Sequence, residues 1–184
     1  MKITNSDELF PVVDEDGNTI GEALRTVCHN GKSRLLHPVV HLHLFNSAGA
    51  LFLQKRAMTK DIQPGKWDTS VGGHFSPGER VEEALVREAK EELGLKNYIP
   101  QFLGRYVWES PRERELVYSF YTTSDEIAVI NRNEIEEGKF WSLQEIINNI
   151  RKDIFTPNFE HEFKMLSLLK SSGRASTSLA GGQA

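Results

Sequence analysis

Cysteine, net charge and long apolar runs are all scarce in this sequence of 184 residues. A single cysteine, Cys28, excludes an internal disulfide and does not by itself indicate a metal site. The formal net charge of −4 argues against a nucleic acid polymer or an anionic membrane surface as partner. No apolar run approaches the length of a membrane span, and the N-terminus lacks the apolar core of a signal peptide. We therefore expect a cytoplasmic protein that attracts any phosphate-bearing ligand locally, through a few cations or metal ions.

The order of the remaining patterns predicts an α+β fold. Apolar residues that alternate with polar ones between turn residues predict strands, and a helical period predicts helices. Strands are expected at 9–14 and 19–24, which form a hairpin, and at 37–45, 50–55, 102–107 and 116–122; helices at 79–93 and about 157–170; and a short strand–helix unit from 140. This order is typical of an α/β/α sandwich, in which a mixed sheet is held between helices.

Three parts of the chain can be separated on the same grounds. Residues 1–36 form an N-terminal extension that contains the hairpin, and residues 37–170 form the main domain. Residues 171–184 are rich in Ser, Gly and Ala and have no apolar pattern, so we expect a flexible tail without a function of its own.

Acidic residues occupy an unusual place on the helix expected at 79–93. Its apolar stripe is marked by Val81, Ala84 and Leu85. At 100° per residue, Glu88 and Glu92 fall within that stripe, and Glu91 lies at its edge. A solvated, charge-rich helix would instead place its acids opposite the apolar residues. Because several like charges side by side are costly to bury unless a cation neutralises them, the pattern favours a divalent metal site.

The same helix belongs to a longer motif that begins at Gly73. Five residues separate Gly73 from Glu79, and seven separate Glu79 from a run that reads Arg-Glu-Ala-Lys-Glu-Glu-Leu-Gly-Leu and ends at Leu95. This pattern resembles the Nudix box, with one soft departure at Ala89, where the family usually has a larger aliphatic residue. The match is specific, because acidic, basic and glycine positions coincide over 23 residues.

The resemblance implies both a fold and a chemistry. The fold is a β-sheet flanked by helices, with the box as a loop–helix–loop. Glu88, Glu91 and Glu92 would bind Mg²⁺ or Mn²⁺, Glu79 would contribute, and Arg87 would orient a box glutamate. The spacing agrees, because Arg87 lies one turn before Glu91 and can hold its carboxylate. Such a site polarises phosphoryl oxygens and activates the attacking water.

Outside the box, residues 14–141 are similar to the branch of the superfamily that includes isopentenyl-diphosphate isomerase. This resemblance implies that the chain could hold a second metal ion at His29, His37, His74, Glu113 and Glu115. It also implies that Arg25, Arg56 and Lys60 bind a diphosphate.

One departure from that branch decides between two activities. The isomerase carries a catalytic cysteine where this chain has Gly72, and a glycine cannot donate or accept a proton. The isomerase box is also degraded, whereas this box is intact. We therefore expect a hydrolase, a pyrophosphatase acting on a nucleoside diphosphate linked to another group or on a related small organic diphosphate. The alternatives are an isomerase and a non-catalytic Nudix module that binds a metabolite. Nudix proteins are often homodimers, although no patch in the sequence indicates one.

Several other residues are open to two interpretations. His41 and His43 share one face of a strand, where they either pack or contact substrate. Trp108, expected near a loop, either stacks on a base or packs in the ordinary way. The acids Glu134, Glu136 and Glu137 form either a solvated loop or a source of the general base. Trp67 and Trp141 are expected in the core, and Cys28 as a small buried residue.

Overall fold

The central strand is β3 (Leu36–Phe45), which is buried along its whole length. Its neighbour β8 (Arg114–Thr123) runs parallel to it over all ten positions. On its other side β3 pairs antiparallel with the short strand β6 (Val71–His74) and, at Phe45, with β4 (Leu51–Arg56). The two strands share this side of β3: β6 pairs with residues 39–42, and β4 meets β3 beyond them at Phe45.

The computed structural model describes residues 8–126 and 128–171, and its main sheet is mixed and has seven strands. Its remaining strands are β5 (Trp67–Asp68) and β9 (Ile135–Trp141), which pair with β4, and β7 (Gln101–Glu109), which pairs with β8. The helices are α1 (Arg25–Cys28), α2 (Val81–Leu93), α3 (Leu143–Asn149) and α4 (Pro157–Ser171). Among these described helices none is long and apolar enough to cross a bilayer.

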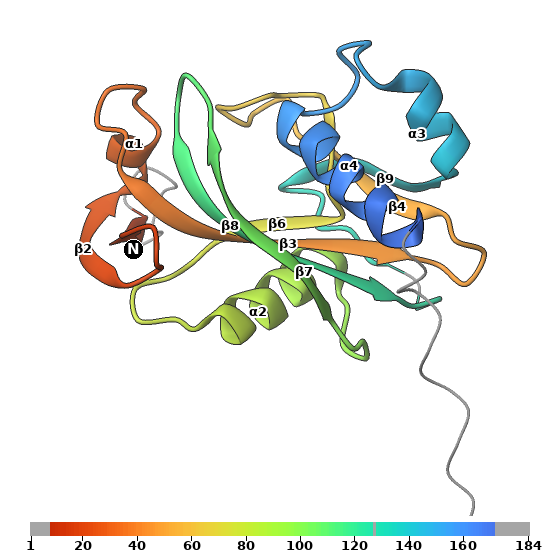
Figure 1. Ribbon diagram of the computed structural model, residues 1–184, viewed down its shortest axis with the longest axis horizontal. Helices are drawn as coiled ribbons and strands as arrows, with labels where there is room; N and C mark the ends of the chain where they lie inside the picture. The colour runs from red at the N-terminus through yellow and green to blue at the C-terminus, as the bar shows by residue number, and fades with distance from the viewer. Residues whose placement is uncertain (1–7, 127, 172–184) are drawn as a thin grey trace, which may run out of the picture.

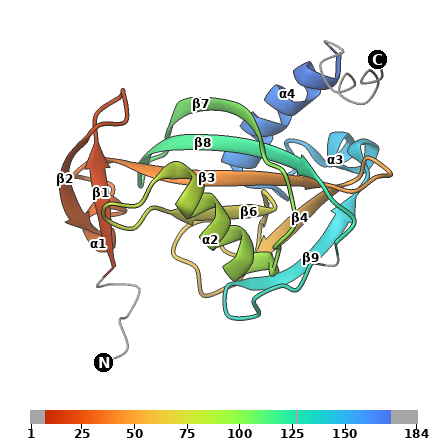
Figure 2. The same ribbon diagram turned by 90° about the horizontal axis from the view of Figure 1, so that it is seen from below.

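Helices cover both faces of the sheet (Figures 1 and 2). On one face, Val40, Leu42 and Leu44 of β3 pack against the apolar stripe of α2. On the other face, Phe159 and Phe163 of α4 form a second core with Ile146 of α3 and with the two buried tryptophans, Trp67 and Trp141. The predicted α/β/α sandwich is confirmed, and the two tryptophans are core residues as expected.

The N-terminal hairpin pairs β1 (Leu9–Val13) with β2 (Thr19–Leu24) in a separate two-stranded sheet. Phe10 is fully buried and stacks on the ring of His74, with the ring centroids 4.1 Å apart. Val13 packs against Leu36 and Leu116 of the main sheet. The hairpin therefore forms part of the wall of the main domain, although the division at residue 36 stays a prediction.

Three expectations about individual elements need correction. Helix α2 begins at Val81 rather than Glu79, because Arg80 has the extended backbone of an N-cap, and Gly94 ends the helix with a φ of 66°. Trp108 lies within β7 and not in a loop, because its segment pairs with β8. Strand β9 starts at Ile135, so Glu136 and Glu137 belong to a strand. The expected tail, apart from Ser171, lies outside the described residues.

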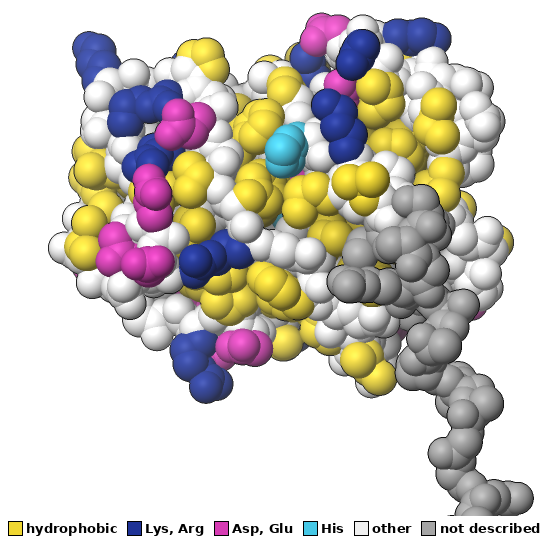
Figure 3. Space-filling model, viewed as in Figure 1, with side chains coloured by type: hydrophobic (Ala, Val, Ile, Leu, Met, Phe, Trp, Pro, Cys, Tyr) yellow, Lys and Arg dark blue, Asp and Glu magenta, His cyan; other side chains and the backbone are white. Residues whose placement is uncertain are grey.

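Charges of both signs are interspersed on the face drawn in Figure 3. Lys and Arg side chains lie beside Asp and Glu side chains, with apolar groups between them. Ion pairs among the described residues include Arg114 with Glu15 at 2.6 Å and Arg114 with Glu109 at 2.7 Å. Such a surface gives an anion no broad field to follow, so an anionic ligand must be recognised within a defined site.

Candidate active site

Two glycines on β6 allow α2 to approach the edge of the sheet. A Cβ at Gly73 would lie 1.9 Å from the carboxyl carbon of Glu88, so no side chain fits there while Glu88 keeps its position. The backbone N–H of Gly72 donates to Glu92 Oε2 over 3.0 Å. The acids of the helix therefore lie directly against the backbone of β6.

The two acids within the stripe of α2 are largely buried. Glu92 also accepts a hydrogen bond from Gln54 Nε2 over 3.0 Å, and its burial raises its pKa to about 8. The Glu88 side chain is 12% exposed, and burial raises its pKa to about 7 although Arg87 opposes the shift. Glu91 is different, because 57% of its side chain is exposed. The structure thus brings Glu88 and Glu92 into the site and leaves Glu91 at its rim.

Arg87 holds this arrangement together through several carboxylates. Its Nε and Nη2 donate to the two oxygens of Glu79 over 2.8 and 2.9 Å, and Nη1 donates to Glu88 over 2.7 Å. Nη2 also donates to the carbonyl of His74 over 2.8 Å, which ties the helix to β6. The expected bond to Glu91 is longer, 3.3 Å. Burial raises the pKa of Glu79, but the bonds from Arg87 and Ser76 outweigh it and lower the pKa, so Glu79 is an ionised partner of Arg87.

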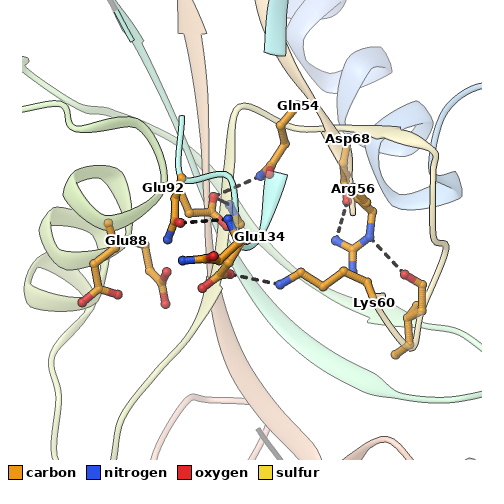
Figure 4. Close-up of polar contacts among 12 residues, drawn as sticks. Gln54, Arg56, Lys60, Asp68, Glu88, Glu92 and Glu134 are labelled. Carbon is orange, nitrogen blue, oxygen red and sulfur yellow. Dashed lines mark hydrogen bonds and ion pairs between the residues drawn. The ribbon is translucent and has the colours of Figure 1, made fainter. Parts of the chain in front are cut away.

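The predicted substrate cations line the same cleft as these acids. Its volume is about 360 Å³, which is within the usual range for small-molecule sites. Arg56 donates to Asp68 over 3.0 Å, and Lys60 donates to Glu134 over 3.0 Å (Figure 4). Arg25 is paired with Glu8 at 3.2 Å. In Figure 4, Glu88 and Glu92 lie on one side and Arg56 on the other, with the Lys60–Glu134 pair between them.

The acidic segment before β9 contributes one residue to the cleft. Glu134 lies on the turn that precedes the strand, beside Lys60. Glu136 instead pairs with Lys55 at the surface, and Glu137 is exposed. Of the three acids left open by the sequence, Glu134 is placed to act on a ligand in the cleft.

Three histidines from separate segments meet at one end of the cleft. His29 follows α1, His37 lies on β3 and His74 ends β6, and one ring nitrogen from each lies within 4.8 Å of the others. Burial lowers the pKa of His29 to about 3, that of His37 to about 4, and that of His74 well below its ordinary value. All three rings are therefore neutral and carry a lone pair at physiological pH.

The surroundings of these rings fit a metal ion. His37 Nδ1 donates to the carbonyl of Leu35 over 3.0 Å, which leaves the buried Nε2 without a hydrogen-bond partner. Glu113 lies 3.5 Å from His29 Nε2, and Glu115 lies 3.9 Å from His74 Nε2. Burial raises the pKa of both acids, that of Glu113 to about 9. A backbone-oriented imidazole with a free nitrogen, beside buried carboxylates that need a positive charge, is the donor set of a divalent transition metal.

A histidine–glutamate pair beneath the cleft was not predicted. His41 Nδ1 donates to Glu162 Oε2 over 2.9 Å, and His43 Nε2 lies 3.3 Å from the same oxygen. His43 is fully buried, so packing holds for His43. His41 lines the cleft, and substrate contact stays a prediction for it. A signal for Glu162 exists in the sequence. It lies between Phe159 and Phe163 on the apolar stripe of α4, just as Glu88 and Glu92 lie on that of α2.

Comparisons with known proteins agree with this geometry. A family model described as NUDIX domain matches residues 35–163, which include the site residues named above except Glu8, Arg25 and His29. The chain is 32% identical over 133 residues to an uncharacterized Nudix hydrolase of Pseudomonas aeruginosa, covering 72% of this chain and 78% of that protein. It is 32% identical over 162 residues to isopentenyl-diphosphate Delta-isomerase 1 of Photorhabdus laumondii, covering 83% and 90%. A crystal structure of DR0079 from Deinococcus radiodurans superposes with a TM-score of 0.73 at 26% identity, covering 85% of this chain and 98% of that one.

Proposed function

Because the chain belongs to the Nudix hydrolase family, we propose that it is a metal-dependent hydrolase that cleaves the pyrophosphate linkage of a small diphosphate compound. The substrate class is a nucleoside diphosphate linked to another group, or a related organic diphosphate. The observation that carries this proposal is the division of the cleft. Buried, protonatable acids of α2 lie on one side, and the cations Arg56 and Lys60 lie on the other.

The acids fit Mg²⁺ or Mn²⁺, which prefer carboxylate oxygens. Glu88 and Glu92 would hold the metal, with Glu91 at the rim and Glu79 fixed behind Arg87. When bound, the metal supplies a polarised phosphoryl oxygen and a more acidic water. Arg56 and Lys60 would bind the phosphates, and their present bonds to Asp68 and Glu134 already hold them in the cleft. Glu134, which pairs with Lys60 in the cleft, would accept a proton there.

A panel of diphosphate compounds tests this proposal most directly. Each compound is incubated with and without Mg²⁺ in water enriched in ¹⁸O, and the released phosphate or mononucleotide is analysed by mass spectrometry. We expect one labelled oxygen in a phosphoryl product, formed only with the metal, and loss of the reaction in Glu92→Gln. Release of product in excess chelator would contradict the metal requirement.

A second candidate, diphosphate isomerisation, is favoured by the assembled group of His29, His37 and His74. Isopentenyl-diphosphate isomerases are also among the similar proteins. Against it stands Gly72, which brings no proton donor to the site where the resemblance places a catalytic cysteine. We therefore expect the chain not to isomerise isopentenyl diphosphate efficiently.

The isomerase question is settled by following two products separately. The chain is incubated with isopentenyl diphosphate, and dimethylallyl diphosphate and phosphate are quantified. Efficient formation of the allylic isomer, lost in Glu115→Gln or His74→Gln, would overturn the choice of hydrolase. Phosphate without isomer supports it. If neither product forms, the diphosphate panel decides between a hydrolase with another substrate and a module that only binds.

A further inference from the structure

The two predicted phosphate-binding cations Arg56 and Lys60 are already paired with acids in the cleft. Arg56 and Lys60 each share their charge with an acid, Asp68 and Glu134. A diphosphate that enters the cleft therefore meets cations whose charge is partly neutralised. It also meets the carboxyl groups of α2. A donor whose counter-charge is hidden from the ligand would attract a phosphate more strongly.

His41 is such a donor. Its Nδ1 faces Glu162, which is fully buried behind it, so the carboxylate is screened from the cleft by the imidazole itself. Although burial favours the neutral ring, the charge and hydrogen bond of Glu162, with smaller contributions from Glu115 and Asp68, raise the pKa of His41 to about 9. The ring is thus an imidazolium at neutral pH, and both of its nitrogens carry a proton.

The free edge of the ring faces the space over Gly72. His41 and Gly72 are paired residues of β3 and β6, and they point to the same face of the sheet. A Cβ built on Gly72 would lie 3.5 Å from His41 Cδ2 and 3.6 Å from Nε2. Because Gly72 has no side chain, this space belongs to the cleft and opens onto Nε2.

We propose that His41 is a substrate-binding residue, whose Nε2–H, fixed by the bond from Nδ1 to Glu162, donates to a phosphate oxygen of a diphosphate bound over Gly72. This inference rests on the proposed function only in taking a diphosphate as the ligand. His43 differs although it contacts the same carboxylate, because it is fully buried and directs Nδ1 to Thr69 Oγ1, 3.1 Å away.

Histidine NMR on the full chain tests the contact without turnover. The protein is labelled with ¹⁵N-histidine and freed of divalent metal, and inorganic pyrophosphate is the probe. The His41 signals are assigned from the His41→Gln spectrum. We expect the Nε2 resonance of His41 to shift on saturation, while that of His43 stays in place. An unmoved His41 signal at millimolar pyrophosphate overturns the proposal.

Binding measurements provide the second readout. His41→Gln should weaken pyrophosphate binding about tenfold, as expected for losing a charged hydrogen bond, whereas His43→Gln should change it less than about twofold. Equal losses in both variants would mean that the contact with Glu162 is merely structural, and would overturn the proposal.

The proposed hydrolysis can fail independently of this contact. Glu92→Gln should lower metal-dependent hydrolysis by a factor on the order of 10² and still show the His41 shift with pyrophosphate. A wild-type chain that hydrolyses no diphosphate but shows the shift would refute the hydrolase and retain the binding residue.

Discussion

The carboxylate of Glu92 on α2 accepts a hydrogen bond from the backbone N–H of Gly72 on β6, 3.0 Å away. One residue further along β6, Gly73 lies so close to Glu88 that even a Cβ would overlap the carboxyl carbon. Two consecutive glycines therefore bring two buried acids against one strand. Because Gly72 and Gly73 point to opposite faces of the sheet, substitutions at the two positions should differ sharply in effect.

We predict that Gly73→Ala lowers turnover at least about tenfold and changes stability little. The new methyl group would displace the Glu88 carboxylate, the flexible end of a side chain, so the catalytic geometry is lost and the fold is kept. Steady-state kinetics and thermal unfolding of the same preparation check this result.

Gly72→Ala is the matched control for that substitution. Its Cβ would meet neighbours at 3.5 Å or more, which is ordinary contact, and would not touch the acids of α2. Because the methyl group enters the space proposed for the diphosphate, Gly72→Ala should raise KM, whereas its kcat should fall less than that of Gly73→Ala. If kcat falls equally in both variants, the close approach of Glu88 to Gly73 is not what the reaction needs.

The buried acids also predict how stability depends on pH in the absence of metal. The pKa of Glu92 in the folded chain is about 8 and that of Glu88 about 7, both raised by burial above the ordinary glutamate value of 4.5. A carboxyl group whose pKa is higher in the folded chain than in the unfolded chain stabilises the folded state at pH values below its unfolded pKa. This stability is lost as the pH rises through the folded pKa. The histidines His29, His37 and His74, whose pKa values burial lowers, act in the opposite direction below about pH 6.5, so metal-free protein should become less stable between about pH 7 and pH 8.

Denaturant unfolding at several pH values, in chelator, measures this slope. Glu92→Gln should be more stable than the wild type at pH 8 and should show a shallower decline. The slope should not vanish, because burial also raises the pKa of Glu113 and Glu115. A metal-free wild type that gains stability across this range would contradict the assignment of raised pKa values.

The sequence predicted the parts of the site that lie on one element or within one motif. The period of α2 placed Glu88 and Glu92 on its buried face, and Gly94 marked its end. Pairings between distant segments were not predictable in this way. Lys60 meets Glu134 only because β4 pairs with β9, and Arg56 meets Asp68 only because β4 pairs with β5.

The meeting of His29, His37 and His74 was likewise not predictable from sequence spacing. The spacing of His29 and His37 says nothing about their distance, and the resemblance alone suggested that they meet. Their contact depends on the short helix α1, which has four residues and no apolar period to reveal it. Phe10, which stacks on His74, belongs to the N-terminal hairpin. No local sequence pattern predicts that this hairpin packs against the main domain.

We predict that the histidine group binds a divalent transition metal in the purified full chain. The unpaired Nε2 of His37 and the buried Glu113 and Glu115 provide its ligands. Elemental analysis after exposure to Zn²⁺ or Mn²⁺ and desalting should find about one equivalent in the wild type and a loss of at least half in His37→Gln. His161→Gln is the control, because His161 is exposed and lies outside the group. Equal metal content in all three proteins would rule out this site.

Glu91→Gln and Glu92→Gln should each lower the Mg²⁺-dependent turnover by a factor on the order of 10², as expected when a metal or electrostatic group is lost. Both variants should stay folded, because Glu91 is largely exposed and Gln at position 92 can still accept the N–H of Gly72. Glu82→Gln is a matched control from the same helix, since its side chain is exposed and takes no part in the cleft.

Wild-type turnover should also rise from about pH 6 to 8. Glu88 and Glu92, whose pKa values burial raises to about 7 and about 8, must lose their protons to bind the metal. Raising the Mg²⁺ concentration should move this rise to lower pH, since the metal competes with the protons for the same carboxylates. A pH profile that does not move with Mg²⁺, together with near-normal rates in both variants, would place the metal elsewhere in the cleft.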